Sequence, residues 1–307
     1  MGKLAALLVG FGGPVSREEV RPFLESVAAG AGVPPSRLEE AARHYERIGA
    51  SPYKAMTERQ RSAAERELAA RGIRVPVLAA YRHSEPSIAG ALTGLKEKGF
   101  DGAAVFVLTP FRCPISYGRY VAAVEQALET LKGGVRLRYT PPFHADQGFT
   151  EAVCARVRRI APAPDDRTFV LFTAHSIPSS AAGAGRYAAE FSRSARRIAQ
   201  RLGLKRWVIA YQSRSGRPQD PWLGPTVDEA IGAIPPSFKR LVIVSTGFLV
   251  DNVEILYDLD IKARQTAESR GLVYARAATV ADEPGFVRLV SDRLAGALNT
   301  LGASSRT

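Results

Sequence analysis

Cysteine is scarce in this sequence, and its scarcity excludes several kinds of site. Only Cys113 and Cys154 occur among the 307 residues, far apart and outside any Cys-x-x-Cys pair. One chain therefore cannot hold a disulfide framework, a four-cysteine metal site or a four-cysteine iron–sulfur cluster. Two isolated cysteines are typical of a protein from a reducing compartment, so we expect a cytoplasmic location.

Long hydrophobic runs are also absent. No apolar run approaches the roughly 18–20 residues that a membrane span requires, so we expect no integral membrane segment. The N-terminal run "LAALLVGFGGP" is broken by glycines and lacks a small-x-small cleavage pattern, which favours a first strand over a signal peptide. Myristoylation is not expected, because Ala6 stands where serine or threonine is required.

Lysine and arginine exceed aspartate and glutamate by 42 to 30, which gives a formal net charge of +12. An excess of this size can indicate nucleic-acid binding. Here the cations are scattered through segments such as "ARVRRI" and "RSARRIAQRLGLKR" and form no dense tract. We therefore expect no nucleic-acid partner, but a basic surface that attracts small anions.

Several common motifs are missing as well. The absence of Gly-x-Ser-x-Gly gives no support for an α/β-hydrolase nucleophile. The stretch "GFGGP" is not followed by the Gly-Lys-Ser/Thr of a phosphate-binding loop, and Val15 stands where G-x-G-x-x-G needs its third glycine. The sequence thus gives little support for a hydrolase, for nucleoside triphosphate binding or for dinucleotide binding.

Short apolar runs that alternate with longer amphipathic runs indicate the fold. The apolar runs are continuous in Val, Ile and Leu rather than alternating, which is typical of parallel strands buried on both faces. The order is βαβα throughout, as in doubly wound α/β proteins. We predict strands at 5–11, 75–81, 103–109, 135–140, 168–174, 207–213, 241–247 and 272–278.

Two proline-rich joints, at 139–149 and 161–166, divide this pattern. Four predicted strands precede the first joint and four follow it. We therefore predict two similar α/β domains, 1–142 and 143–307, with an active cleft between them. No direct sequence repeat accompanies the likeness of pattern.

Two of the four histidines, His83 and His175, come directly after predicted strands in different halves. Ligands of open α/β sheets bind beyond the carboxyl ends of the strands, so both histidines are candidates for the cleft. A carboxylate run, "DNVEILYDLD", follows another strand, and its Glu254 and Asp258 are four residues apart on one helix face, with Asp251 one turn earlier. The alternative is a solvated acidic stripe at a helix N-terminus, but the apolar "VSTGFLV" before it directs this helix start into the interior.

These residues resemble the ferrochelatases, which insert Fe(II) into a porphyrin to make haem or coprohaem. The resemblance runs nearly end to end through "FGGP", "HYERIGASPYKAMTERQ", "TAHSIP", "DPWLGP" and "GFLVDNVEILYDLD". It implies two Rossmann-like domains, each a parallel sheet flanked by helices, with the porphyrin between them. It also implies that His175 and Glu254 bind the metal and accept protons from the ring. Iron is then a substrate, and no prosthetic group or iron–sulfur cluster is expected.

The physical demands of metal insertion suggest further porphyrin-binding residues. Aromatic side chains can grip the ring faces, cations can pair with propionates, and Asp258 extends an acidic outer face. For Trp222 the alternative is ordinary packing in a proline-rich turn. The expected porphyrin-binding set is Phe11, Lys54, Arg82, His83, Arg112, Ser116, Tyr117, Tyr120 and Trp222.

The chain departs from the family pattern at three places. Phe11 stands where some bacterial members have a tyrosine, and Ala28 and Ala29 lie where many members have an arginine-bearing loop. Lys262 occupies the next step of an acidic ladder that often continues past Asp258, so a second, outer metal site is not expected.

We expect coproporphyrin III to be preferred over protoporphyrin IX. The chain leaves little room for an apolar lip, it ends in a predicted helix and a polar tail, and a basic protein attracts four propionates more than two. The missing loop arginine and the apolar Phe11 argue the other way. We expect a monomer with transient contacts to adjacent haem-pathway enzymes. Two alternatives remain open here, a cobalt or sirohydrochlorin-type chelatase and a non-catalytic porphyrin-binding or haem-binding paralogue.

Overall fold

The chain forms two four-stranded parallel sheets. In a computed structural model, which describes residues 2–29, 34–162, 165–215 and 220–303, all eight predicted strands are present within two residues of their expected ends. The strand order is β2-β1-β3-β4 in one sheet and β6-β5-β7-β8 in the other. The strands are β1 (Leu4–Gly10), β2 (Val77–Tyr81), β3 (Gly102–Val107), β4 (Arg136–Tyr139), β5 (Thr168–His175), β6 (Trp207–Gln212), β7 (Arg240–Ser245) and β8 (Val273–Ala277).

Helices cover both faces of each sheet, which confirms the predicted α/β fold. Leu7 and Leu8 point to opposite faces of β1, and both are 0% exposed. Such two-sided burial explains why the strands are continuous apolar runs. The helices are α1 (Val20–Ala28), α2 (Pro35–Ile48), α3 (Tyr53–Ala70), α4 (Ile88–Glu97), α5 (Arg119–Thr130), α6 (Gln147–Ile160), α7 (Ala184–Leu202), α8 (Val227–Gly232), α9 (Arg264–Ser269) and α10 (Pro284–Ala303), with two π-helices, η1 (Pro114–Gly118) and η2 (Glu254–Ala263).

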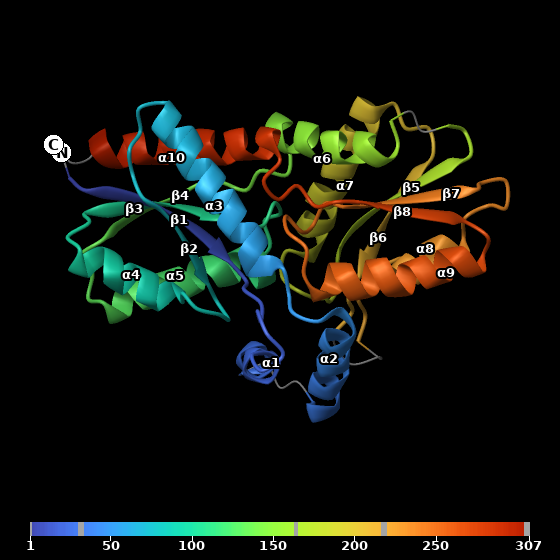
Figure 1. Cartoon of the computed structure of the whole chain (residues 1–307), viewed down its shortest axis with the longest axis horizontal. Coiled ribbons are helices and arrows are strands. Elements are labelled where there is room, and N and C mark those ends of the chain that lie inside the picture. Colours follow the sequence, from blue (N-terminus) through green and yellow to red (C-terminus); the bar gives the residue numbers. More distant parts are fainter. Residues whose placement is uncertain (1, 30–33, 163–164, 216–219, 304–307) are drawn as a thin grey trace.

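Two helices cross between the halves. Helix α6 follows β4 but packs against α7 and β8, whereas α10 follows β8 but packs against α3 and the sheet of β1, β3 and β4. Figure 1 shows α6 and α10 in line along one edge of the molecule, with α1 and α2 at the opposite edge. The division after residue 142 stays a prediction, and the segment 143–307 contributes α10 to the cover of the first sheet.

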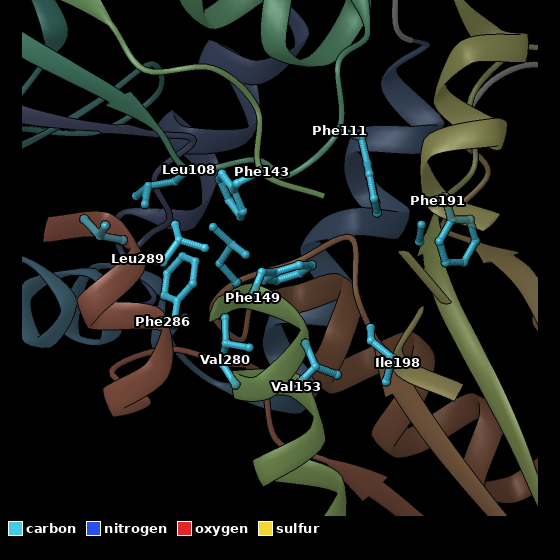
Figure 2. Close-up of a cluster of buried hydrophobic side chains, with 14 of the residues drawn as sticks. Leu108, Phe111, Phe143, Phe149, Val153, Phe191, Ile198, Val280, Phe286 and Leu289 are labelled. Carbon is cyan, nitrogen blue, oxygen red and sulfur yellow. The ribbon is translucent and has the colours of Figure 1, made fainter. Parts of the chain in front are cut away.

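One hydrophobic cluster extends through both halves (Figure 2). Phe143, in the joint after β4, stacks on Phe106 of β3 with ring centroids 5.1 Å apart and lies 5.6 Å from Phe286 of α10. Phe149 of α6 meets Phe143 edge to face at 5.4 Å. The proline-rich joint is therefore packed into the core and does not act as a solvated linker.

Helices α1 and α2 form an insertion between β1 and α3. Their apolar residues make a small cluster around Phe23 and Tyr45, against which Phe11 of the first half and Val253 of the second half both pack. The insertion therefore lies where the two halves meet. None of the helices in the described ranges is both long and apolar enough to cross a membrane.

Candidate functional site

The site is built at the carboxyl ends of the strands where each sheet reverses its strand order. In the second sheet this point lies between β5 and β7, and ligands of open α/β sheets bind at such points. His175 is the last residue of β5, and η2 begins at Glu254 after the loop that leaves β7. A Cβ atom at Gly247 would lie 2.9 Å from Cα of Ala174, so glycine there allows this loop to pass close to the end of β5.

His175 and Glu254, both predicted from the sequence, lie side by side. Nε2 of His175 is 3.6 Å from Oε2 of Glu254, and the two side chains are 32% and 28% exposed. Nδ1 of His175 contacts the backbone oxygen of Ser176, which fits a ring with its proton on Nδ1 and its lone pair on Nε2. The pair therefore presents an imidazole nitrogen and a carboxylate oxygen to the same point.

The environment of Glu254 suits a proton acceptor. Burial raises the pKa of the Glu254 carboxyl, and the nearby Asp258 raises it further, while His175 lowers it. Oε2 of Glu254 is buried and has no hydrogen-bond partner among the described residues. A buried carboxylate oxygen without a donor is free to receive a proton or a metal ion.

Glu254 and Asp258 lie on a π-helix, although the sequence predicted an ordinary α-helix. A π-helix closes its hydrogen bonds five residues apart, so a spacing of four still keeps both side chains on nearly one face. Ser213, which has a positive φ of 62°, donates its hydroxyl to Asp258. Burial raises the pKa of Asp258, and Lys262 partly offsets this effect.

Asp251, the first member of the acidic run, has a structural role instead. Arg276 of β8 binds Asp251 at 3.2 Å and Asp260 of η2 at 2.7 Å, and its side chain is only 10% exposed. Thr279 also donates to Asp251, at 3.0 Å. One arginine thus holds both the approach to η2 and its middle turn.

Phe11 and His83 face each other on the first half, with ring centroids 4.8 Å apart. Nδ1 of His83 is 3.1 Å from the hydroxyl of Ser26 on α1, and burial and the neighbouring Arg82 lower the pKa of His83 to about 4. His83 is therefore a neutral ring at physiological pH. Ala28 and Ala29, where the chain departs from the family pattern, lie at the C-terminal end of α1, the helix that carries Ser26.

The other predicted porphyrin-binding residues are spread along the same half. The guanidinium of Arg82 lies 5.5 Å from the ring of the buried Tyr120. Lys54 is half-buried at the start of α3, and its side chain makes no hydrogen bond or ion pair with another described residue. Arg112 is exposed just before η1, on which Ser116 contacts Thr109 at 3.4 Å and Tyr117 donates to the backbone oxygen of Thr140 at 3.0 Å.

Trp222 comes from the second half, in the loop before α8. Its backbone pairs with Pro178, three residues after His175, and its indole nitrogen is buried with no hydrogen-bond partner among the described residues. The pairing places Trp222 beside the loop that leaves His175.

Sequence reasoning assigned no role to several residues that support the site. Gln212 donates to the backbone oxygen of Glu254 at 2.9 Å, and Tyr187 donates to that of His175 at 2.9 Å. His44 of α2 stacks on Tyr257 of η2 with centroids 3.6 Å apart. Gln212 lies at a strand end and could have been suspected, whereas Tyr187 and His44 lie within helices that gave no such signal. Within the described part of the chain, no group of three or more His, Cys, Asp or Glu could hold a metal ion.

Comparison with known proteins places this site in a family. The Ferrochelatase family model matches residues 3–298. A ferrochelatase from Rhodopirellula baltica is 37% identical, with 95% of this chain and 86% of the relative covered. A coproporphyrin III ferrochelatase from Mycolicibacterium smegmatis is 36% identical, with 94% and 88% covered.

A solved structure supports the fold. SirB from Bacillus subtilis with Fe3+ matches with a TM-score of 0.62 and 17% identity, and the match covers 98% of both chains. At this identity the likeness concerns the fold alone. The match to the family over nearly the whole chain is the stronger finding, and by it the chain belongs to the ferrochelatase family, the lyases that insert a metal ion into a porphyrin.

Proposed function

We propose that this protein inserts Fe(II) into coproporphyrin III, and that His175 and Glu254 are its metal-binding and proton-accepting residues. The observation that carries the proposal is the 3.6 Å contact between Nε2 of His175 and Oε2 of Glu254. This contact lies where the strand order of the second sheet reverses, and open α/β sheets bind their ligands at such points. Iron is the substrate, and the proposal includes no resident cofactor.

The chemistry needs both members of the pair. Insertion exchanges two pyrrole N–H protons for one Fe(II) ion, so two protons must leave the ring. A neutral imidazole can accept a proton near pH 7 and can also bind Fe(II) through nitrogen. The raised pKa of Glu254 makes its carboxylate a better proton acceptor than an exposed glutamate.

Two protein ligands make a deliberately weak iron site. A cage of four ligands would retain the metal, whereas a donor to the ring must release it. Glu254 and His175 can therefore hold Fe(II) briefly beside the ring. Bending the flat ring toward the metal costs strain, which binding of the ring's periphery can offset.

The first half supplies the surface for the ring. Phe11 and Tyr117 offer aromatic contact, and Trp222 offers it from the second half. Arg82, Arg112 and Lys54 offer cations for the propionates, because a carboxylate pairs strongly with a guanidinium. The two walls meet at the α1–α2 insertion, where Phe11 and Val253 pack on one cluster.

Two observations support coproporphyrin III over protoporphyrin IX. The relative from Mycolicibacterium smegmatis, at 36% identity, is a coproporphyrin III ferrochelatase, as is one from Leifsonia xyli at 34%. The net charge of +12 also favours a substrate with four propionates over one with two. The likeness to SirB is one of fold and gives no separate support to a sirohydrochlorin substrate.

The test is a comparison of kcat/KM for Fe(II) insertion into the two porphyrins, without oxygen or detergent and at physiological ionic strength. We expect coproporphyrin III to have the higher value. A preference for protoporphyrin IX, or a requirement for lipid, would contradict the substrate while leaving the chelatase activity intact. Porphyrin that binds but is never metallated would contradict the activity itself and would indicate a carrier.

A further inference from the structure

One face of α7 contacts both halves of the chain at the site. Tyr187 and Glu190 are three residues apart on this helix, so they lie on the same side of it. Tyr187 donates its hydroxyl to the backbone oxygen of His175 at 2.9 Å. Glu190 instead reaches the loop after β3 in the other half, where its Oε2 accepts from the backbone nitrogen of Arg112 at 2.6 Å.

Glu190 is an unusual residue at that position. Its side chain is 7% exposed, and a buried carboxylate is costly unless it is well paired. Its partners are the Arg112 backbone nitrogen, Nε of Arg186 at 2.9 Å and Nδ1 of His144 at 3.4 Å. An apolar side chain could fill the same volume but could not accept this hydrogen bond. What the carboxylate contributes is therefore a fixed position for the Arg112 backbone.

The loop that Glu190 holds leads directly to η1. Arg112 has an exposed side chain, and Ser116 and Tyr117 follow it within six residues. The far end of this segment is fixed where Tyr117 donates to the backbone oxygen of Thr140 at 3.0 Å. Glu190 therefore fixes the near end of a segment that carries three of the expected porphyrin contacts.

Aromatic packing joins the two contacts of α7. Phe111, which precedes Arg112, meets Tyr187 edge to face with centroids 5.4 Å apart and is only 1% exposed. Tyr187 thus touches the end of β5 through its hydroxyl and the loop after β3 through its ring. A shift of this loop relative to His175 would have to break the Glu190 bond and repack Phe111.

We propose that Tyr187 and Glu190 are positioning residues, which set the placement of the Arg112–Tyr117 segment relative to His175. This inference rests on the proposed function. Glu190 positions the segment that is expected to contact the ring's periphery, so it should govern porphyrin affinity. Tyr187 binds the backbone of His175, so it should govern turnover.

The experiment compares Glu190→Ala, Glu190→Gln and Tyr187→Phe with Ser194→Ala. Ser194 lies on the same helix, is 0% exposed, and has a buried hydroxyl with no partner among the described residues, so it controls for the loss of a buried polar group. Each variant is assayed for coproporphyrin III binding by fluorescence, for Zn(II) insertion and for Tm. Binding needs no metal, so it is read independently of turnover.

We expect Glu190→Ala to raise the porphyrin Kd and KM by about tenfold with a smaller change in kcat, as loss of one charged hydrogen bond would. Glu190→Gln, which keeps an oxygen acceptor for Arg112, should fall between Glu190→Ala and wild type. Tyr187→Phe should lower kcat by several-fold at unchanged Kd. Ser194→Ala should change neither.

Glu190 variants that lower only Tm, with Kd and KM within about twofold of Ser194→Ala, would overturn the proposal. If Glu190→Ala does not fold, the isosteric Glu190→Gln decides by the same criterion. Wild-type protein that binds coproporphyrin III but inserts no metal contradicts the proposed function, and the Kd series still tests Glu190. Wild-type protein that binds no porphyrin overturns both.

Discussion

The two halves of this molecule share one topology. The strand orders β2-β1-β3-β4 and β6-β5-β7-β8 are the same when each half is numbered from its own first strand. In both halves a π-helix follows the third strand, η1 after β3 and η2 after β7. π-helices are rare and often occur at functional sites, so their matched placement makes the turn after the third strand a candidate ligand contact in each half.

The residues at matched positions differ completely. At the end of the first strand the second half has His175, and the first half has Phe11 directly after β1. After the third strand the second half has Glu254 at the start of η2, and the first half has Arg112 in the loop before η1. Under the proposed function, one half holds the groups that exchange protons and metal, and the other holds rings and cations. The shared fold supplies equivalent positions, and the side chains at those positions determine the role of each half.

Among the tests of this division of roles, His175→Ala has the largest expected effect. We expect the rate of metal insertion to fall by about 10²–10⁴-fold with little change in porphyrin Kd, because a base and metal ligand is lost. The control is His83→Ala in the other half, which should change Kd more than kcat because His83 packs on Phe11 at 4.8 Å. Equal losses of kcat in both variants would break the comparison.

Glu254→Gln should lower kcat by about 10²-fold and yet raise Tm by a few degrees. Burial raises the pKa of Glu254 above its ordinary value of 4.5, so the charged form costs stability when the pH is above the folded pKa. That cost disappears once the pH falls below the pKa of the unfolded state, where the carboxyl is protonated in both states. The gain in Tm should therefore be greatest at neutral pH and vanish in acid, as calorimetry at several pH values can show. A variant less stable than wild type at pH 7 would contradict this prediction.

Arg276→Met tests what holds η2 in place. Asp251 and Asp260, which are half-buried, would lose their cation, so we expect a loss of about 2–3 kcal/mol in the free energy of unfolding and a lower kcat. Arg21→Met is the matched control, because Arg21 also pairs with two carboxylates but is 61% exposed, and its loss should change the free energy of unfolding much less than Arg276→Met. Urea unfolding measures both, and similar losses would show that Arg276 is not special.

The smallest expected effect concerns salt. Raising the ionic strength from about 0.05 M to 0.5 M should lower kcat/KM for coproporphyrin III by a few-fold more than for protoporphyrin IX, because screening weakens attraction to four charges more than to two. Parallel curves for the two porphyrins would mean that the basic surface does not contribute to substrate choice.

The sequence predicted the strands well because continuous apolar runs are a local pattern. It also selected His175 and Glu254, which the structure places 3.6 Å apart, whereas their catalytic roles stay a prediction. Continuous apolar runs mark buried parallel strands, His175 ends one of them, and Glu254 opens the helix that follows another. The π-helices were not predicted, since "VEILYDLD" has the spacing of an ordinary helix, and contacts of η2 such as that of Arg276 with Asp260 join residues 16 apart in the chain. Glu190 was missed for a similar reason. Its partner is a backbone nitrogen 78 residues away, and no local pattern identifies such a pair.

The exchange of α6 and α10 has a consequence for synthesis on the ribosome. The sheet of β1 to β4 is translated within the first half of the chain, but the helix that packs on β1, β3 and β4 spans Pro284–Ala303. Until those residues leave the exit tunnel, one face of the sheet lacks its final cover, and exposed apolar surface of this kind favours aggregation of nascent chains. We therefore expect the first half to depend on chaperones during translation, and the last helix to complete it.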